Sequence, residues 1–243
     1  MYFFVLLYMR KKSTYVCIQL SQCKFKREIV LGICGVGIPA SIQNLLNVTG
    51  MTILNNFTAG FGADAVAAMG ITQKINMVPM NIAMGMSQGI MPLISYNYSS
   101  RNYKRMKGTL LFSARISLGF LAVVAIGYYV GAGKLISLFM ENETIIAYGT
   151  RFLRGFCIGL PFLCMDFLAV GVFQAVGMGK HALGFAIMRK IILEIPAIYI
   201  LNAIFPLYGL AYTQFTAELV LAVVAVIVLM RLFRKLENRA ETE

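Results

Sequence analysis

Charged residues and metal ligands are scarce in this sequence of 243 residues. Only 13% of the residues are charged, whereas a soluble domain carries roughly 25%. There is a single histidine, His181, and the five cysteines form no C-x-x-C pair. A histidine-rich or cysteine-paired metal site is therefore not indicated, and neither is an oxidising compartment. These shortages argue against an ordinary soluble domain and against a bound metal.

Sequence signatures of common enzymes are also missing. The sequence contains no H-E-x-x-H, no G-x-S-x-G, no Walker A pattern and no paired-carboxylate spacing. Residues 177–180 read GMGK, but the rest of a phosphate-binding loop is absent. We therefore expect a protein that is not an enzyme, has no cofactor and has no ATP-hydrolysing domain of its own.

The positive charge does not point to nucleic acid. The formal net charge is +12, and such a charge can reflect binding to polyanions. Here the basic residues fall in short clusters between apolar runs, without a basic face interleaved with aromatic residues. We therefore expect no nucleic-acid partner.

Long uncharged segments are what the sequence has in abundance. Hydrophobic residues make up 59% of the chain, and the mean hydropathy is +0.75. Residues 75–100 contain no Asp, Glu, Lys, Arg or His, and about 20 mainly apolar residues suffice to cross a bilayer. Gly85, Gly89 and Pro92 lie in this segment, and a membrane helix tolerates them because its neighbours satisfy freed backbone groups. The pattern predicts a membrane helix that is interrupted at Pro92.

The same reasoning predicts six membrane spans and no strands. We expect a bend at Pro39 in the first span and a break at residues 131–134 after the third, followed by a short interfacial helix. The expected spans are residues 29–63, 66–98, 107–130, 144–177, 182–204 and 210–232.

The ends of the chain complete the expected domain organisation. Residues 1–9, MYFFVLLYM, precede a basic cluster, which is the reverse of a signal peptide. They fit the end of a preceding membrane helix better than a short amphipathic start. We therefore expect residues 1–28 to be a helix end with a basic linker, 29–233 to be a six-helix lobe, and 234–243 to be a polar tail.

Basic residues are distributed unequally between the two sides that six alternating spans define. One side would hold fifteen Lys and Arg, and the loops of the other side only Lys134. Because basic residues concentrate in cytoplasmic loops, the richer side, with both chain ends, is predicted to be cytoplasmic. The remaining Lys and Arg lie within spans or at their ends, where several could reach an interface.

Four motifs resemble the second half of a multidrug and toxic compound extrusion (MATE) transporter. Residues 37–43, GIPASIQ, resemble the G-x-P-A-x-x-Q that opens the family's seventh helix. Residues 87–98, SQGIMPLISYNY, resemble its eighth-helix motif, although Ser99 and Ser100 replace the small Gly-Ala that follows there. Residues 173–177, FQAVG, resemble the end of the tenth helix, and residues 189–196, RKIILEIP, part of the eleventh.

This resemblance implies an all-α integral membrane protein, and the chain would be the C-terminal six-helix lobe of a twelve-helix MATE-type transporter. The missing N-terminal six-helix lobe, the lipid bilayer and a small organic substrate would be its partners. Sodium-coupled members carry a glutamate eight residues after the seventh-helix proline, where Asn47 stands here. They also carry an aspartate in the tenth helix, where Asp166 lies, so any Na⁺ would bind near Asp166.

Three acidic residues fall inside predicted spans, where a charge costs about 2.5–3.5 kcal/mol on insertion scales. Asp166 has no compensating charge nearby in the sequence, so it is the first candidate for a proton or cation site, with a structural role as the alternative. Glu194 follows Lys190 by four residues, and this spacing favours an ion pair on one helix face. Glu218 would pair with a basic group of the same lobe or bind the transported ion.

Amides and methionines supply the candidate substrate cavity. We expect Gln43, Asn47 and Asn76 to line it, and the other amides to join helices. Methionine and phenylalanine side chains suit varied apolar cations, because methionine adapts its shape. The positions expected to bend and gate the helices are Pro39, Gly85, Gln88, Gly89 and Pro92, with the two glycines also allowing close packing.

The combined prediction is secondary efflux of organic, mainly cationic, compounds by antiport against H⁺ or Na⁺. The location would be the plasma membrane (the inner membrane) of a bacterium. Two alternatives remain: a flippase for lipid-linked oligosaccharides from the same superfamily, whose cavity would need basic residues, and an inactive truncated product.

Overall fold

The computed structural model describes residues 27–242, and every regular element within them is helical. The chain divides into two units at the boundary between Gly35 and Val36. The described part of the first unit is the opening of one helix, residues 27–35. All further contacts and sites belong to the second unit. The expected helix end at residues 1–9 lies outside the described residues.

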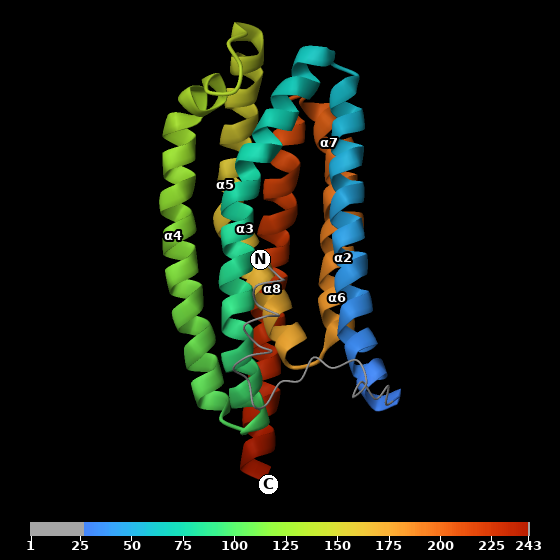
Figure 1. Cartoon of the computed structure of the whole chain (residues 1–243), viewed down its shortest axis with the longest axis vertical. Helices are drawn as coiled ribbons and strands as arrows, with labels where there is room; N and C mark the ends of the chain where they lie inside the picture. The colour runs from blue at the N-terminus through green and yellow to red at the C-terminus, as the bar shows by residue number, and fades with distance from the viewer. Residues whose placement is uncertain (1–26, 243) are drawn as a thin grey trace, which may run out of the picture. The chain divides into compact units, whose positions relative to one another are not determined.

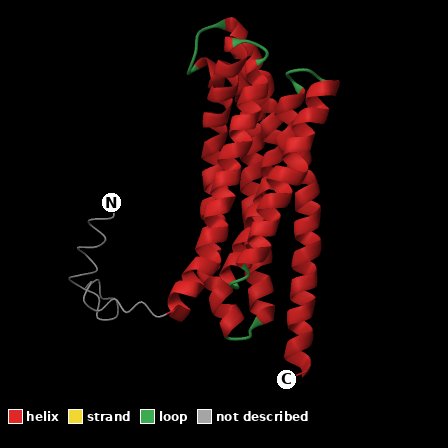
Figure 2. Cartoon of the chain, turned by 90° about the vertical axis from the view of Figure 1, so that its right-hand side faces the viewer, coloured by secondary structure: helices red, strands yellow, loops and turns green. Residues whose placement is uncertain are grey.

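The helices match the six expected spans in number and order. Within the second unit they run alongside one another, as Figures 1 and 2 both show. The first four spans and the sixth are single helices. The fifth span consists of three consecutive segments. The elements are α2 (Arg27–Ala59), α3 (Ala63–Ser99), α4 (Tyr103–Ser137), α5 (Glu143–Ala175), α6 (Gly179–Ile187), η2 (Met188–Glu194), α7 (Ile195–Ile204) and α8 (Gly209–Thr242).

Four of the described helices, α2, α4, α5 and α8, are long and apolar enough to cross a membrane by length and composition. α3 is 37 residues long, but its amides and hydroxyls lower its hydropathy. The fifth span is divided into short helices, none of which alone is long enough to cross a membrane. The site described below draws side chains from α2, α3, α5, η2 and α8.

Two expected interruptions are absent. α3 continues through Pro79 and Pro92 without a break, so the predicted interruption at Pro92 is wrong. α4 likewise continues to Ser137, so neither the break at residues 131–134 nor the separate helix after it exists. Ala132 and Ile136 are fully buried, and a Cβ on Gly133 would lie 3.6 Å from Thr150 Oγ1 of α5. Packing on α5 therefore keeps this glycine-rich stretch helical.

α8 extends further than the last span. It continues to Thr242 and so includes the polar segment expected as a tail. Glu, Lys, Arg and Ala are good helix formers, and Phe233 and Leu236 are buried. The helix therefore persists after its hydrophobic span has ended.

α5 is the central helix of the second unit. It packs on α3, α4, α6 and α8, and most residues from Phe152 onward are buried. Gly155 allows α8 to come close, because a Cβ there would lie 2.7 Å from Ala211 Cβ. A Cβ on Gly171 would similarly collide with Ser87 Oγ of α3. α5 therefore fixes the positions of its neighbours.

The FQAVG motif is the C-terminal cap of α5. Gly177 has φ +78°, a conformation that glycine adopts without strain. Its N–H donates to Gln174 O at 3.0 Å, and Met178 N–H donates to Phe173 O at 2.7 Å. This pair of bonds is a Schellman motif, so the glycine of the motif turns the chain directly into α6.

Candidate functional site

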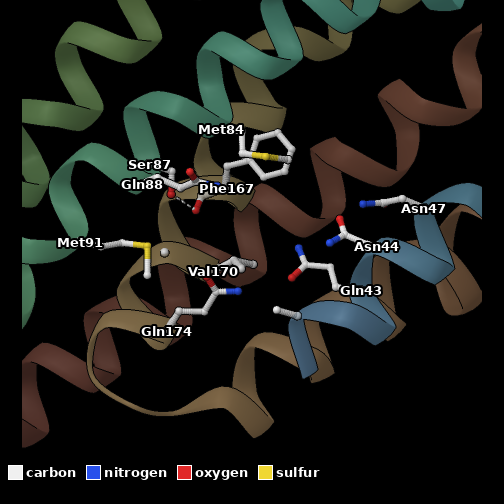
Figure 3. Close-up of a pocket in the computed structure, with 12 residues that line it drawn as sticks. Gln43, Asn44, Asn47, Met84, Ser87, Gln88, Met91, Phe167, Val170 and Gln174 are labelled. Carbon is white, nitrogen blue, oxygen red and sulfur yellow. Dashed lines mark hydrogen bonds between the residues drawn. The ribbon is translucent and has the colours of Figure 1, made fainter. Parts of the chain in front are cut away.

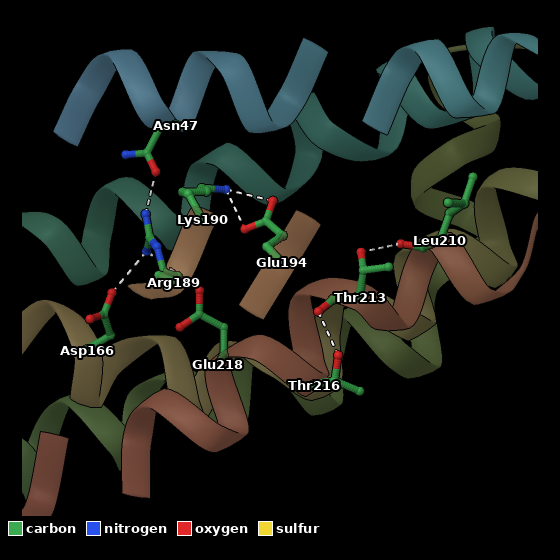
Figure 4. A network of polar contacts seen from close by, with 9 residues as sticks. All are labelled: Asn47, Asp166, Arg189, Lys190, Glu194, Leu210, Thr213, Thr216 and Glu218. Carbon is green, nitrogen blue, oxygen red and sulfur yellow. Dashed lines mark hydrogen bonds and ion pairs between the residues drawn. The ribbon is translucent and has the colours of Figure 1, made fainter. Parts of the chain in front are cut away.

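A cluster of buried charges is centred on Arg189 of the π-helix η2. Its Nη1 donates to Asp166 Oδ2 of α5 at 3.0 Å, and the same atom lies 3.6 Å from Glu218 Oε1 of α8. Its Nη2 donates to Asn47 Oδ1 of α2. As Figure 4 shows, four elements thus contribute one side chain each. The side chains of Arg189, Asp166 and Glu218 are each at most 3% exposed, so the contacts replace lost hydration.

Some buried polar atoms of this cluster have no hydrogen-bond partner within the described chain. Asp166 Oδ1, Glu218 Oε2 and Arg189 Nε are buried and have no hydrogen-bond partner among the described residues. A buried carboxylate oxygen without a partner is costly. The cluster therefore has acceptor oxygens that a proton or a small cation could use.

A second ion pair lies on the same π-helix. Lys190 Nζ donates to Glu194 Oε1 and Oε2 at 2.7 and 2.6 Å, so the ion pair expected from their spacing is confirmed. α2 fits against the pair at Gly50, where a Cβ would lie 3.1 Å from Lys190 Cδ and 3.2 Å from Glu194 Oε1. The pair is thus held between η2 and a glycine that leaves room for it.

A polar pocket of about 130 Å³ lies between α2, α3 and α5. Gln43 and Asn47 line it as expected, together with Asn44, Gln88 and Gln174. Figure 3 shows the amides of Gln43 and Gln174 pointing toward one another across the pocket. Within the described residues, neither of these two amides makes a hydrogen bond. The pocket therefore offers free donors and acceptors to a polar ligand.

The apolar part of the pocket wall is adaptable. Met84 and Met91 contribute thioethers from α3, and Phe167 contributes a ring from α5. The ring of Phe167 lies 5.6 Å from Arg189 Cζ, within the range of a cation–π contact. Phe167 thus borders both the pocket and the charge cluster.

One hydrogen bond joins two of the helices that line the pocket. Ser87 Oγ of α3 donates to Phe167 O of α5 at 2.6 Å, as the dashed line in Figure 3 marks. The absence of a side chain at Gly171 allows this approach. α3 and α5 are thereby joined directly.

The other predicted site residues lie elsewhere. Asn76 is buried in α3, its Oδ1 has no partner among the described residues, and it is outside the pocket lining. Gly85 and Gly89 have nothing within 4 Å of an added Cβ. Close packing at these two glycines is therefore not found within the described chain. Pro39 lies inside a continuous α2, and Gln88 is the one predicted gating residue that lines the pocket.

The sequence prediction missed the role of Arg189. It grouped this residue with basic side chains that could reach an interface, whereas Arg189 is 2% exposed and central to the cluster. The available signal was one acidic residue in the fourth span and another in the sixth, because each needs a counter-charge inside the membrane. Among the described residues, no group of three His, Cys, Asp or Glu side chains could hold a metal ion.

Comparisons with known proteins identify the family. The MatE family model matches residues 39–200. The multidrug export protein MepA of Staphylococcus saprophyticus is 31% identical over 226 residues, which cover 93% of this chain and 49% of that protein. Its Staphylococcus aureus counterpart is 32% identical over 227 residues, with the same coverage of both proteins. The chain thus spans about half the length of these curated relatives.

Solved structures agree on the fold. A multidrug resistance MATE family transporter of the MOP superfamily, in an outward-facing conformation, superposes with a TM-score of 0.88 at 24% identity and covers 96% of this chain and 54% of its own. The Vibrio cholerae MATE transporter VcmN in its bent form gives a TM-score of 0.85 at 18% identity, with 96% and 52% covered. The charge cluster and the amide pocket are therefore built on a six-helix MATE-type membrane lobe, and the chain belongs to the MatE family.

Proposed function

We propose that this chain is the C-terminal lobe of a multidrug efflux transporter that exports organic cations by antiport against H⁺ or Na⁺. The two MepA relatives are multidrug export proteins about twice as long as this chain. In this proposal an N-terminal six-helix lobe supplies the opposing wall of the cavity. The pocket of about 130 Å³ is smaller than the roughly 300 Å³ at which ligand sites begin, as half a cavity would be.

The observation that carries the proposal is the charge balance around Arg189. Asp166, Glu194 and Glu218 provide three carboxylates, and Arg189 and Lys190 provide two cations. With all five groups ionised, one negative charge is in excess inside the membrane region. Such a charge is expensive there, so uptake of one proton or one monovalent cation is favourable.

Asp166 and Glu218 compete for the same atom of Arg189. Nη1 lies 3.0 Å from Asp166 and 3.6 Å from Glu218. Protonation of Asp166, or binding of Na⁺ to it, removes its attraction for the guanidinium and lets Arg189 shift toward Glu218. This shift would disturb the Asn47 contact, and since Asn47 also lines the pocket, the ion would weaken the binding of the outgoing substrate.

The distribution of basic residues supports the proposed membrane orientation. The start of α4, which carries Lys104, Arg105 and Lys107, lies at the same end of the second unit as the last part of α8, which carries Arg234 and Lys235 (Figure 1). We place this basic end in the cytoplasm, with both chain ends, and the protein in the plasma membrane of a bacterium. Gating by Pro39, Gly85, Gln88, Gly89 and Pro92 remains a prediction, in which the open sides of Gly85 and Gly89 would face the rest of the transporter.

No specific observation favours the flippase. A cavity for a lipid-linked oligosaccharide would need basic residues for the pyrophosphate, and the residues lining the described pocket are amides, hydroxyl-bearing or apolar. Lys190 is already engaged by Glu194, and Arg189 by Asp166. We therefore keep multidrug efflux as the proposal.

The test is gradient-driven efflux of ethidium from vesicles that contain the transporter with both lobes. Asp166→Asn removes the ionisable group while preserving its shape, and we expect it to abolish efflux. Asp64→Asn makes the same chemical change at an exposed position of α3 and should leave efflux intact. Unchanged efflux in Asp166→Asn would show that the proposed ion site is wrong.

A further inference from the structure

An apolar crevice runs between α4 and α8, with α5 as its floor. It consists of two adjoining cavities of about 530 and 610 Å³. Met165 of α5 and Val226 of α8 line both cavities, so the two adjoin and together form the crevice, whose length is called the channel below. The crevice lies on α5 but outside the lining of the amide pocket, and none of the charge-cluster residues lines it.

The crevice is polar at one end only. Lys107 of α4 and Arg234 of α8 line the first cavity, and both residues are exposed. The remaining lining of that cavity is apolar and includes Leu111 and Met230, while Leu118 and Leu219 belong to the second cavity. Among the described residues, two basic side chains thus stand at the entrance of a crevice whose remaining lining is hydrocarbon.

The length of the crevice matches one leaflet of a bilayer. Lys107 and Leu118 are eleven residues apart on α4, which corresponds to about 16 Å along a helix. Half of a hydrocarbon core of about 30 Å is roughly 15 Å. An acyl chain that enters beside Lys107 would therefore lie along the crevice to the middle of the membrane.

We propose that this crevice is a binding site for an anionic phospholipid. One acyl chain fills the channel over Met165 and Val226, and the phosphate group lies between Lys107 and Arg234. Basic pockets between membrane helices are suited to anionic head groups, and each nearby Lys or Arg favours an anionic over a neutral lipid about fivefold. The charge at the entrance argues for this occupant over a helix of another protein, which would need no phosphate partner.

The chain contains no tryptophan, so the fluorescence of a single introduced tryptophan comes from that position alone. Leu111→Trp places it in the channel. Phe112→Trp is the matched control, because Phe112 is 66% exposed on the same turn of α4 and does not line either cavity. The full chain, reconstituted in phosphatidylcholine vesicles, is titrated with brominated phosphatidylglycerol or brominated phosphatidylcholine, which quench tryptophan on contact.

We expect brominated phosphatidylglycerol to quench Leu111→Trp at a much lower mole fraction than brominated phosphatidylcholine, and both lipids to quench Phe112→Trp alike. Lys107→Gln and Arg234→Gln should each lower the preference about fivefold. The charge-preserving pair Lys107→Arg and Arg234→Lys should retain it, which separates loss of charge from loss of folding.

Three results would overturn the proposal. Equal quenching of Leu111→Trp by both lipids would show a crevice without head-group recognition. A preference that survives both Gln substitutions would place the phosphate elsewhere. Protection of Leu111→Trp from both lipids, with Phe112→Trp still quenched, would show that protein fills the channel.

Discussion

The charge cluster and the amide pocket share Asn47, yet they are built in opposite ways. Arg189, Asp166 and Glu218 are almost completely buried and lie on three different elements. Gln43 is half-buried, Asn44 is exposed, and neither makes a hydrogen bond within the described residues. The cluster satisfies most of its groups internally, whereas the pocket leaves its groups for a ligand.

This difference fits two separate roles for the cluster and the pocket. Buried ion pairs depend on exact geometry, because removal of one partner strands the other in a medium of low dielectric constant. Amides and methionines tolerate rearrangement at small cost, which suits ligands of varied shape. In the proposed antiport, the cluster would bind the ion and the pocket would contact the substrate, with Asn47 as their link.

The largest effect is expected at the centre of the cluster. Arg189→Met leaves Asp166 and Glu218 without a counter-charge, and breaking a buried pair in this way costs about 3–5 kcal/mol. The measurement is unfolding of the purified chain in detergent with increasing dodecyl sulfate, followed by circular dichroism.

A neutralised cluster provides the control for that loss. Asp166→Asn and Glu218→Gln added to Arg189→Met should restore most of the stability, because no charge is then stranded. If Arg189→Met alone unfolds like the wild type, the cluster is not rigid and the contrast with the pocket disappears.

An intermediate effect is expected at the shared residue. Asn47→Ala removes the acceptor of Arg189 Nη2, and an unsatisfied buried donor costs about 1–3 kcal/mol. Asn44→Ala removes an amide from the same pocket without breaking a hydrogen bond. The same unfolding assay should therefore separate the two variants, and equal stability would mean that Asn47 belongs functionally to the pocket alone.

The smallest effect on stability is expected for an amide that only lines the pocket. Gln43→Ala should change the free energy of unfolding by no more than about 0.5 kcal/mol, as for substitutions away from tightly packed features. It should nevertheless weaken the binding of an organic cation such as ethidium, measured by fluorescence anisotropy with the complete transporter. A large loss of stability would show that the pocket is structural.

The sequence predicted the spans well because the bilayer fixes their length. Apolar runs and basic clusters located all six, and α2 and α5 agree with expectation to within a few residues. Gly131 and Gly133 misled the prediction for α4, since packing on α5 overrides a local preference for a turn. Pro92 misled the prediction for α3, because a membrane helix can continue through a proline that would break a soluble helix.

The site was only partly predictable, because its contacts join distant parts of the chain. The spacing of Lys190 and Glu194 on one helix was enough to predict their ion pair. Arg189 and Asp166 are 23 positions apart, and Arg189 and Asn47 are 142 apart. No local pattern reports on such a pairing, and only helix packing brings the side chains together.

The π-helix η2 determines where the fifth span can lose or gain a residue during evolution. A π-turn accommodates a residue more than an α-turn, so η2 fits one additional residue between α6 and α7 over nearly the same rotation. Deleting one residue from Met188–Glu194 would therefore restore ordinary α-helical winding and keep α6 and α7 nearly in phase. The same deletion within α7 would rotate the segments by about 100° and turn Ile198, which is fully buried, outward. The length of the fifth span is therefore more tolerant of change within η2 than within the α-helices on either side.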